Sequence, residues 1–135
     1  MENQSSEHLK ILGEKVTHSI EASEMECFPC PPDVTKVSFT TDEFTSNCPK
    51  TFQPDYYRVK IIYQPKELCI ESKSLKLYLW RYRNTGQFCE ELSHIILTDI
   101  VNRIDPFNCK VILEMAPRGG IGMESVAEYG LEKIS

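Results

Sequence analysis

The sequence predicts one α+β domain in which antiparallel strands flank two consecutive helices, in the order ββααββ. Residues 57–63 and 109–115 alternate apolar and polar side chains with period two, as half-buried strands do. Residues 88–104 instead repeat apolar side chains at helical spacing. We expect the two helices to cover one face of an antiparallel sheet of four strands. The exposed edges of such a sheet favour assembly into an oligomer.

The composition argues against several classes of protein. The chain has 135 residues, the usual size of one domain, and 41% of them are hydrophobic, so it can bury a core without disulfides or metal. Its net charge of −5 argues against direct binding to nucleic acid, which requires a basic surface. No apolar run is long enough to cross a membrane, and no secretion signal opens the sequence. We therefore expect a cytoplasmic protein whose six cysteines are reduced.

Residues 1–35 are predicted to form an N-terminal arm and linker, and residues 36–135 a single domain. The early region is polar, and prolines stiffen residues 28–32. Cys27 and Cys30 have CxxC spacing, but no second pair of cysteines or histidines completes four zinc ligands. No metal site is therefore predicted.

The first half of the domain is predicted to form strands followed by a helix. Residues 37–41 are expected to be an edge strand, and residues 68–71 to pair back against residues 57–63 after a short turn. The next stretch has leucines at every second residue, yet its composition favours a helix. Ser72 is its predicted N-cap and Gly86 its stop.

The second half is predicted to form a helix followed by a hairpin. The helix over residues 88–104 is ended by the Asp-Pro pair at 105–106. Residues 109–115 form the next strand, residues 117–120 a tight turn, and residues 121–128 the strand that pairs back.

A candidate nucleophile lies in the loop before the second strand. Cys48 is outside any apolar period, so we expect an exposed thiol, and Lys50 nearby favours the reactive thiolate. Asp55 follows, close enough through a turn for its carboxyl group to serve the same reacting centre. From these residues alone, a catalytic cysteine and an incidental loop cysteine both remain open.

A candidate anion site lies at the start of the first helix. Lys73 and Lys76 are three residues apart, which on a helix puts both ammonium groups on one face near the N-terminus. A solvated amphipathic turn is the alternative. No Gly-x-Gly-x-x-Gly motif is present, which excludes a dinucleotide site of the Rossmann type.

Four motifs in sequence order resemble one enzyme family. They are Cys48-Pro-Lys-Thr-x-Gln-Pro-Asp55, Glu71-Ser-Lys-Ser-Leu-Lys-Leu-Tyr78, Phe88-x-Glu90 and Pro117-Arg-Gly-Gly-Ile121. Together they resemble the short, single-domain NADPH-dependent 7-cyano-7-deazaguanine reductases of queuosine biosynthesis, a tRNA modification. The resemblance implies the tunnelling fold, in which ββααββ subunits assemble into rings with sites between subunits. It also implies a homo-oligomer, either a pentamer or a decamer.

The resemblance implies a mechanism and a set of site residues. Cys48 would attack the nitrile carbon of 7-cyano-7-deazaguanine to give a covalent thioimide, Asp55 would supply a proton, and two hydrides from NADPH would give the aminomethyl product. The residues implied to bind the substrate are Ile70, Glu71, Ser72, Phe88, Cys89 and Glu90. The residues implied to bind the cofactor phosphates are Lys73, Lys76 and Arg118.

Two positions depart from the family's usual residues. Phe52 stands where the family usually has glycine, the residue that adopts positive φ at least cost. Cys89 stands where the family usually has histidine, and a thiol replaces an imidazole poorly as a proton donor. At the start of a helix Cys89 is expected to have a lowered pKa and to form a disulfide with Cys48 on oxidation. The alternative is that Cys89 packs as a small apolar residue.

Two other functions remain open. One is an amidinotransferase of the tunnelling fold, which would treat the same thioimide with ammonia or an amine; the lysine signature favours reduction over this transfer. The other is a non-catalytic purine-binding module. A zinc enzyme of the GTP cyclohydrolase type is least favoured, because the cysteines and histidines lack the required spacing.

Overall fold

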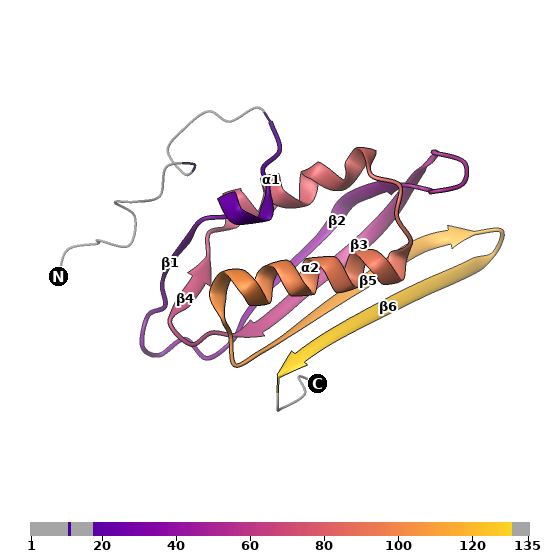
Figure 1. Cartoon of the computed structure of the whole chain (residues 1–135). Coiled ribbons are helices and arrows are strands. Elements are labelled where there is room, and N and C mark those ends of the chain that lie inside the picture. The colour runs from indigo at the N-terminus through magenta and orange to yellow at the C-terminus, as the bar shows by residue number, and fades with distance from the viewer. Residues whose placement is uncertain (1–10, 12–17, 131–135) are drawn as a thin grey trace.

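The computed structural model describes residue 11 and residues 18–130. Four antiparallel strands form the main sheet in the order β2-β3-β5-β6. Their bounds are β2 Val37–Asn47, β3 Pro54–Gln64, β5 Asn108–Arg118 and β6 Ile121–Gly130. The helices α1 (Ser72–Trp80) and α2 (Cys89–Ile104) lie side by side on one face of this sheet (Figure 1). The predicted α+β class and the ββααββ order are confirmed.

A second, two-stranded sheet corrects one predicted pairing. The strand β4 (Leu68–Ile70) pairs antiparallel with β1 (Cys27–Pro29) and not with residues 57–63. The strand β3 has no edge left for β4, because β2 and β5 take both of its sides. A side chain of β3 nevertheless reaches β4, since the Ile70 N–H donates to the Tyr63 hydroxyl at 2.9 Å.

The region before β2 contributes to the hydrophobic core. Ile20, Met25 and Cys27 are all buried in the same cluster as the sheet and the helices. A short 3₁₀ helix, η2 (Ala22–Glu24), lies between the first two of them. The division of the chain into an arm over residues 1–35 and a domain over 36–135 stays a prediction.

Strand β2 extends beyond its predicted end because of a bulge. The register with β3 shifts between Thr41 and Phe44, which interrupts the alternation that the sequence would otherwise show. After the bulge, Phe44 and Ser46 face the core and are buried. The bulge thus carries the strand on to Asn47, next to the candidate nucleophile.

Helix α1 begins and ends differently from the prediction. Its N-cap is Glu71 and not Ser72, because the Glu71 carboxylate accepts the N–H groups of Lys73 and Ser74 at 2.8 Å each. The helix ends at Trp80 and continues as the 3₁₀ helix η3 (Arg81–Asn84). Gly86 therefore ends no helix.

Helix α2 matches its prediction closely. It begins at Cys89 with Phe88 as N-cap, and it ends at Ile104 with Asp105 as C-cap, whose φ of 46° is left-handed. Its apolar stripe packs on the sheet, and Leu92, Ile96 and Ile100 have no exposed surface. Each such side chain contributes roughly 1.5–3 kcal/mol of burial free energy.

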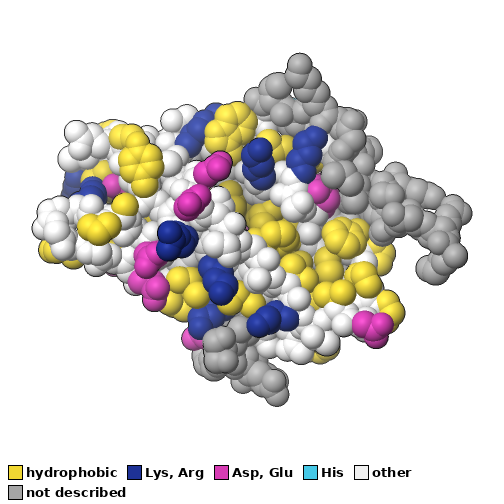
Figure 2. Space-filling view, turned by 180° about the vertical axis from the view of Figure 1, so that it is seen from behind, with side chains coloured by type: hydrophobic (Ala, Val, Ile, Leu, Met, Phe, Trp, Pro, Cys, Tyr) yellow, Lys and Arg dark blue, Asp and Glu magenta, His cyan; other side chains and the backbone are white. Residues whose placement is uncertain are grey.

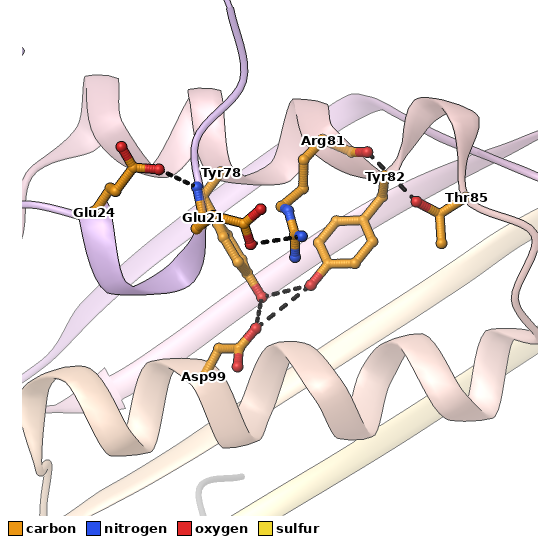
Figure 3. A network of polar contacts seen from close by, with 7 residues as sticks. All are labelled: Glu21, Glu24, Tyr78, Arg81, Tyr82, Thr85 and Asp99. Carbon is orange, nitrogen blue, oxygen red and sulfur yellow. Dashed lines mark hydrogen bonds and ion pairs between the residues drawn. The ribbon is translucent and has the colours of Figure 1, made fainter.

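A buried polar network joins the two helices (Figure 3). The Tyr78 hydroxyl on α1 donates to the Asp99 carboxylate on α2 at 2.5 Å and lies 2.8 Å from the Tyr82 hydroxyl. Burial, followed by the proximity of Tyr82 and Asp99, raises the pKa of Tyr78, so this phenol stays a neutral donor. Beside them, Arg81 forms an ion pair with Glu21 at 2.7 Å.

The other face of the sheet is covered by neither helix. Figure 2 shows this side of the molecule, where side chains of both charges lie among hydrophobic ones. Two cross-strand ion pairs lie on this face, Arg58 with Glu114 at 3.5 Å and Lys110 with Glu128 at 4.0 Å. Among the described residues, no helix is long and apolar enough to span a membrane.

We expect the substitution Asp99→Ala to destabilise the fold by about 1.5–3 kcal/mol, because it removes a charged acceptor from the buried Tyr78 hydroxyl. Urea unfolding followed by circular dichroism measures the change. Thr98→Ala, at an exposed position of the same helix, is the control and should stay within about 0.5 kcal/mol of the wild type. Equal midpoints for the two variants would contradict a stabilising network.

Candidate active site

Three segments from distant parts of the sequence meet at one end of the molecule (Figure 1). They are the β2–β3 loop, the β5–β6 hairpin and the start of α2. Backbone contacts join the β2–β3 loop to the segment before α2. The Asn47 N–H donates to the Thr85 carbonyl at 3.0 Å, and Asn47 forms an isolated β-bridge with Gly86. A Cβ at Gly86 would lie 3.3 Å from the Pro49 Cα, so glycine permits this close approach.

The loop that carries Cys48 is closed by two backbone hydrogen bonds. The Cys48 N–H donates to the Gln53 carbonyl, and the Phe52 N–H donates to the Cys48 carbonyl, both at 2.8 Å. Phe52 has a φ of 59°, the left-handed conformation that the family's usual glycine would adopt at no steric cost. Its ring is 70% exposed and gains little from packing.

The Cys48 side chain is buried, at 7% exposure, and the expectation of an exposed thiol is wrong. The closed loop turns the side chain inward. Hydrogen bonds from the Thr51 side chain, from the backbone N–H groups of Thr51 and Lys50, and from Arg118 lower the pKa of Cys48 to about 6. Lys50 thus favours the Cys48 thiolate through a hydrogen bond from its backbone N–H.

Asp55 and Arg118 form an ion pair beside this cysteine. The Arg118 Nη1 lies 3.1 Å from the Asp55 Oδ1, and the Asp55 side chain is 4% exposed. Asp55 stands opposite Ser46 in the β2–β3 pairing, which fixes it near the loop. The Oδ1 atom accepts no well-directed hydrogen bond, so its attraction to the guanidinium is mainly that of charge.

At the start of α2 the three candidate residues differ in exposure. Phe88 is 52% exposed and Glu90 is exposed, so both can face a ligand. Cys89 is 3% exposed, and its Sγ lies 3.9 Å from the Leu113 carbonyl on β5. Burial, followed by the nearby Glu90 and Asp55, raises the pKa of Cys89 to about 11.

The expected lowering of the Cys89 pKa is therefore wrong. The sulfur packs into the core instead of facing the N–H groups at the start of the helix. The alternative, packing as a small apolar residue, is confirmed. Contact of Cys89 with a substrate, and a disulfide with Cys48, stay predictions.

The remaining substrate candidates lie at the start of α1, at the other end of the molecule (Figure 1). Ile70 and Glu71 are buried at 3% and 4% exposure, whereas Ser72 is exposed. Both carboxylate oxygens of Glu71 are occupied by the N–H groups that they cap. One chain therefore does not bring these residues to the Cys48 loop.

The two candidate phosphate ligands on α1 have different surroundings. The Lys73 Nζ donates to the Ile11 carbonyl at 2.8 Å. Lys76 is exposed and lines a groove of about 820 Å³ between α1 and β2. Trp80 and Arg83 line the same groove, and the Arg83 guanidinium lies 4.1 Å from the centre of the Trp80 ring.

This arrangement can perform nucleophilic chemistry. A cysteine that is largely thiolate at neutral pH can add to an electrophilic carbon, and a buried carboxyl group beside it can relay a proton.

Two features of the site were not predicted from the sequence. One is the role of Thr51, although it lies within the Cys-Pro-Lys-Thr motif, and the other is the proximity of Arg118 to Cys48. No group of three or more His, Cys, Asp or Glu side chains within the described part of the chain could hold a metal ion.

Comparisons with known proteins agree on one family. The family described as QueF-like protein matches residues 54–133. Proteins named NADPH-dependent 7-cyano-7-deazaguanine reductase from Bacillus pumilus (strain SAFR-032) and Bacillus subtilis (strain 168) are each 47% identical over 94 residues. The match covers 70% of this chain but 57% of either relative, so the chain spans little more than half of their length.

A solved structure gives the same fold. The archaeosine synthase QueF-Like, crystallised in its apo form, superimposes with a TM-score of 0.69 at 25% identity. The similarity covers 75% of this chain and 99% of that protein. The fold of this chain is therefore the tunnelling fold implied by the sequence motifs.

We expect Phe52→Gly to stabilise the protein by several tenths to about 1 kcal/mol, because relief of left-handed strain exceeds the entropy cost of glycine. Lys50→Gly, in the same loop at a residue without positive φ, is the matched control and should destabilise by about 0.5–1 kcal/mol. Urea midpoints of the two variants measure this difference. A loss of stability in both would show that the Phe52 conformation carries no strain.

Proposed function

This chain belongs to the QueF-like protein family, and from that premise we propose that it reduces 7-cyano-7-deazaguanine to its aminomethyl product with NADPH, a step of queuosine biosynthesis. The observation that carries the proposal is the pairing of a cysteine whose pKa is lowered to about 6 with a buried aspartate beside it. A nitrile carbon is an electrophile for which a thiolate is a suitable nucleophile.

In this proposal Cys48 and Asp55 perform the covalent step. The Cys48 sulfur forms a bond to the nitrile carbon, and one π bond of the nitrile becomes a lone pair on nitrogen. Asp55 passes to that nitrogen one proton taken up from solvent, because the Cys48 thiolate carries none, and a neutral thioimide remains. After the first reduction, Cys48 leaves as a thiolate and frees an imine for the second.

The cofactor is proposed to bind through cationic side chains of this chain. Lys73, Lys76 and Arg118 fit the phosphates of NADPH, since ammonium and guanidinium groups are the usual protein ligands of phosphate. Each NADPH would supply one hydride when bound, so two cofactors are needed for each amine. The Lys73 Nζ donates to the Ile11 carbonyl, and because an ammonium group has three N–H donors, phosphate binding there does not require loss of that hydrogen bond.

Recognition of the deazaguanine base is proposed for the start of both helices. The exposed Glu90 carboxylate suits the paired N–H donors of a guanine-like edge, and the exposed Phe88 ring can stack on the base, with Cys89 beneath them. The segment of Ile70, Glu71 and Ser72 would contact the same base.

We propose that the complete site forms between two copies of the chain in a ring-shaped homo-oligomer, a pentamer or a decamer. Within one folded molecule, the start of α1 and the Cys48 loop lie at opposite ends (Figure 1). A second copy of the chain is therefore needed to bring the two together. Among the described residues, one edge of β6 pairs with no other strand, and the outer edge of β2 has a single bridge, from Asn47 to Gly86. Such edges suit pairing between subunits.

The structural similarity to an archaeosine synthase supports a second candidate function, amidine formation from the same thioimide. Ammonia or an amine would then add to the thioimide carbon and Cys48 would leave, with no redox change. The Lys73 and Lys76 pair favours reduction.

Incubation with the nitrile should give a covalent adduct at Cys48, because the thiolate adds to the nitrile before any hydride is needed. Intact-mass spectrometry should show protein plus one substrate mass, and Cys48→Ala should abolish it. Cys30→Ala, at a partly buried cysteine outside the site, is the control and should keep the adduct. An unchanged mass at saturating nitrile would contradict the nucleophile assignment.

With NADPH present, nitrile-dependent oxidation should consume two cofactors per amine formed. Lys76→Ala should raise the NADPH KM roughly 10- to 100-fold, as loss of a charge-assisted hydrogen bond does, and should leave the adduct intact. If the adduct forms, NADPH is never oxidised and ammonia yields an amidine, the transferase function holds instead.

At NADPH concentrations below the wild-type KM, mixing an inactive Cys48 variant with an impaired Lys76 variant should restore activity if the site is shared between subunits. Cys48→Ala and Lys76→Ala chains, unfolded together and refolded as mixed oligomers, should regain about a quarter of the wild-type rate, because a random equal mixture forms that share of sites without either substitution. Each variant refolded alone is the control. No gain on mixing, or an active monomer by light scattering, would contradict a shared site.

A further inference from the structure

We propose that Arg118 and Thr51 together hold the Cys48 sulfur as an anion ready to attack, which makes Arg118 a positioning residue for Cys48 and Asp55 in addition to any contact with cofactor. The inference deepens the proposed function, because it concerns the nucleophile of that reaction. It also applies to the protein without substrate or cofactor.

The position of Arg118 allows it to bridge two acidic groups. Its Nη1 lies 3.1 Å from the buried Asp55 Oδ1, and its guanidinium also forms a hydrogen bond with Cys48. A guanidinium presents several donors in a rigid plane, so it can serve both anions at once. Cys48 and then Asp55 raise the pKa of Arg118, so the bridge remains positively charged.

The β5–β6 hairpin holds Arg118 in this position. Arg118 is the last residue of β5 and pairs with Ile121 across a turn in which Gly119 and Gly120 have φ values of 61° and 80°. The side chain is 54% exposed. It therefore covers the buried cysteine and aspartate from the solvent side, where a cofactor phosphate could also reach it.

Thr51 and its neighbours complete the environment of the sulfur from the loop itself. The Thr51 side chain and the N–H groups of Lys50 and Thr51 all form hydrogen bonds with the Cys48 sulfur. The left-handed Phe52 closes this turn, since its N–H donates to the Cys48 carbonyl. Successive N–H groups in such a turn form a concave site that favours an anion.

The other titratable groups near the sulfur add no further cation. From β3, Tyr57 is buried and burial raises its pKa, so it is neutral. From α2, Cys89 is neutral because its pKa is raised to about 11, and the neighbouring Glu90 is acidic. Asp55 is also acidic. Lys50 contributes through its backbone N–H, so among the described residues that lower the pKa of Cys48, Arg118 is the one that acts through a cationic side chain.

Alkylation tests this without substrate or cofactor. Full-length protein is treated with iodoacetamide over a range of pH, and peptide mass spectrometry gives the rate at Cys48. The wild-type rate should reach half of its plateau at about pH 6. Arg118→Ala and Thr51→Val should each shift the midpoint towards the ordinary cysteine value of about 8.5, and Arg118→Lys should restore part of the shift.

Arg58→Ala is the matched control, because it removes an arginine from the other face of the sheet that pairs with Glu114. It should leave the midpoint at about pH 6. A wild-type midpoint near 8.5, or an unchanged midpoint in both Arg118→Ala and Thr51→Val, would overturn the proposal. If Arg118 serves only the cofactor, Arg118→Ala raises the NADPH KM without moving the midpoint, which also overturns it. Failure of the reductase proposal alone leaves the alkylation result unaffected.

Discussion

The packing of two antiparallel helices on one face of the four-stranded sheet determines where the candidate functional residues lie. Alternate side chains of β3 and β5 face the helices, so Val59, Ile61 and Leu113 are almost completely buried against them. The bond from Tyr78 to Asp99 then fixes α1 relative to α2 (Figure 3). Because α2 runs back across the sheet, its N-terminus lies at the end where the β2–β3 and β5–β6 hairpins also turn (Figure 1).

At that end, backbone strain and electrostatics support each other. A phenylalanine in a left-handed conformation costs about 1–2 kcal/mol, yet it closes the turn whose N–H groups face the Cys48 sulfur. The attraction between Asp55 and Arg118 is stronger where water is partly excluded, and the Asp55 side chain is buried. The loop thereby gives a low pKa to one cysteine, whereas burial in the core raises the pKa of Cys89 and Cys109.

The start of α1 illustrates how one motif serves structure and chemistry together. Glu71 caps the helix with both carboxylate oxygens, which neutralises the anion-binding capacity of the first N–H groups. The adjacent lysines therefore depend on their side chains to attract phosphate. Since these lysines lie far from Cys48 within one chain, the fold by itself supplies two halves of a site, and assembly is the simplest way to combine them (Figure 1).

The sequence by itself determined those features that depend on residues close together in the chain. The apolar stripe of α2, the alternation of β3 and the short separation of Cys48 from Asp55 all follow from neighbouring residues. Only the tertiary structure decided that β4 pairs with β1, that Cys89 is buried with a raised pKa, and that Arg118 lies beside Cys48. These features depend on contacts between segments far apart in the chain, and local periodicity carries no information about which distant segment fills a given space.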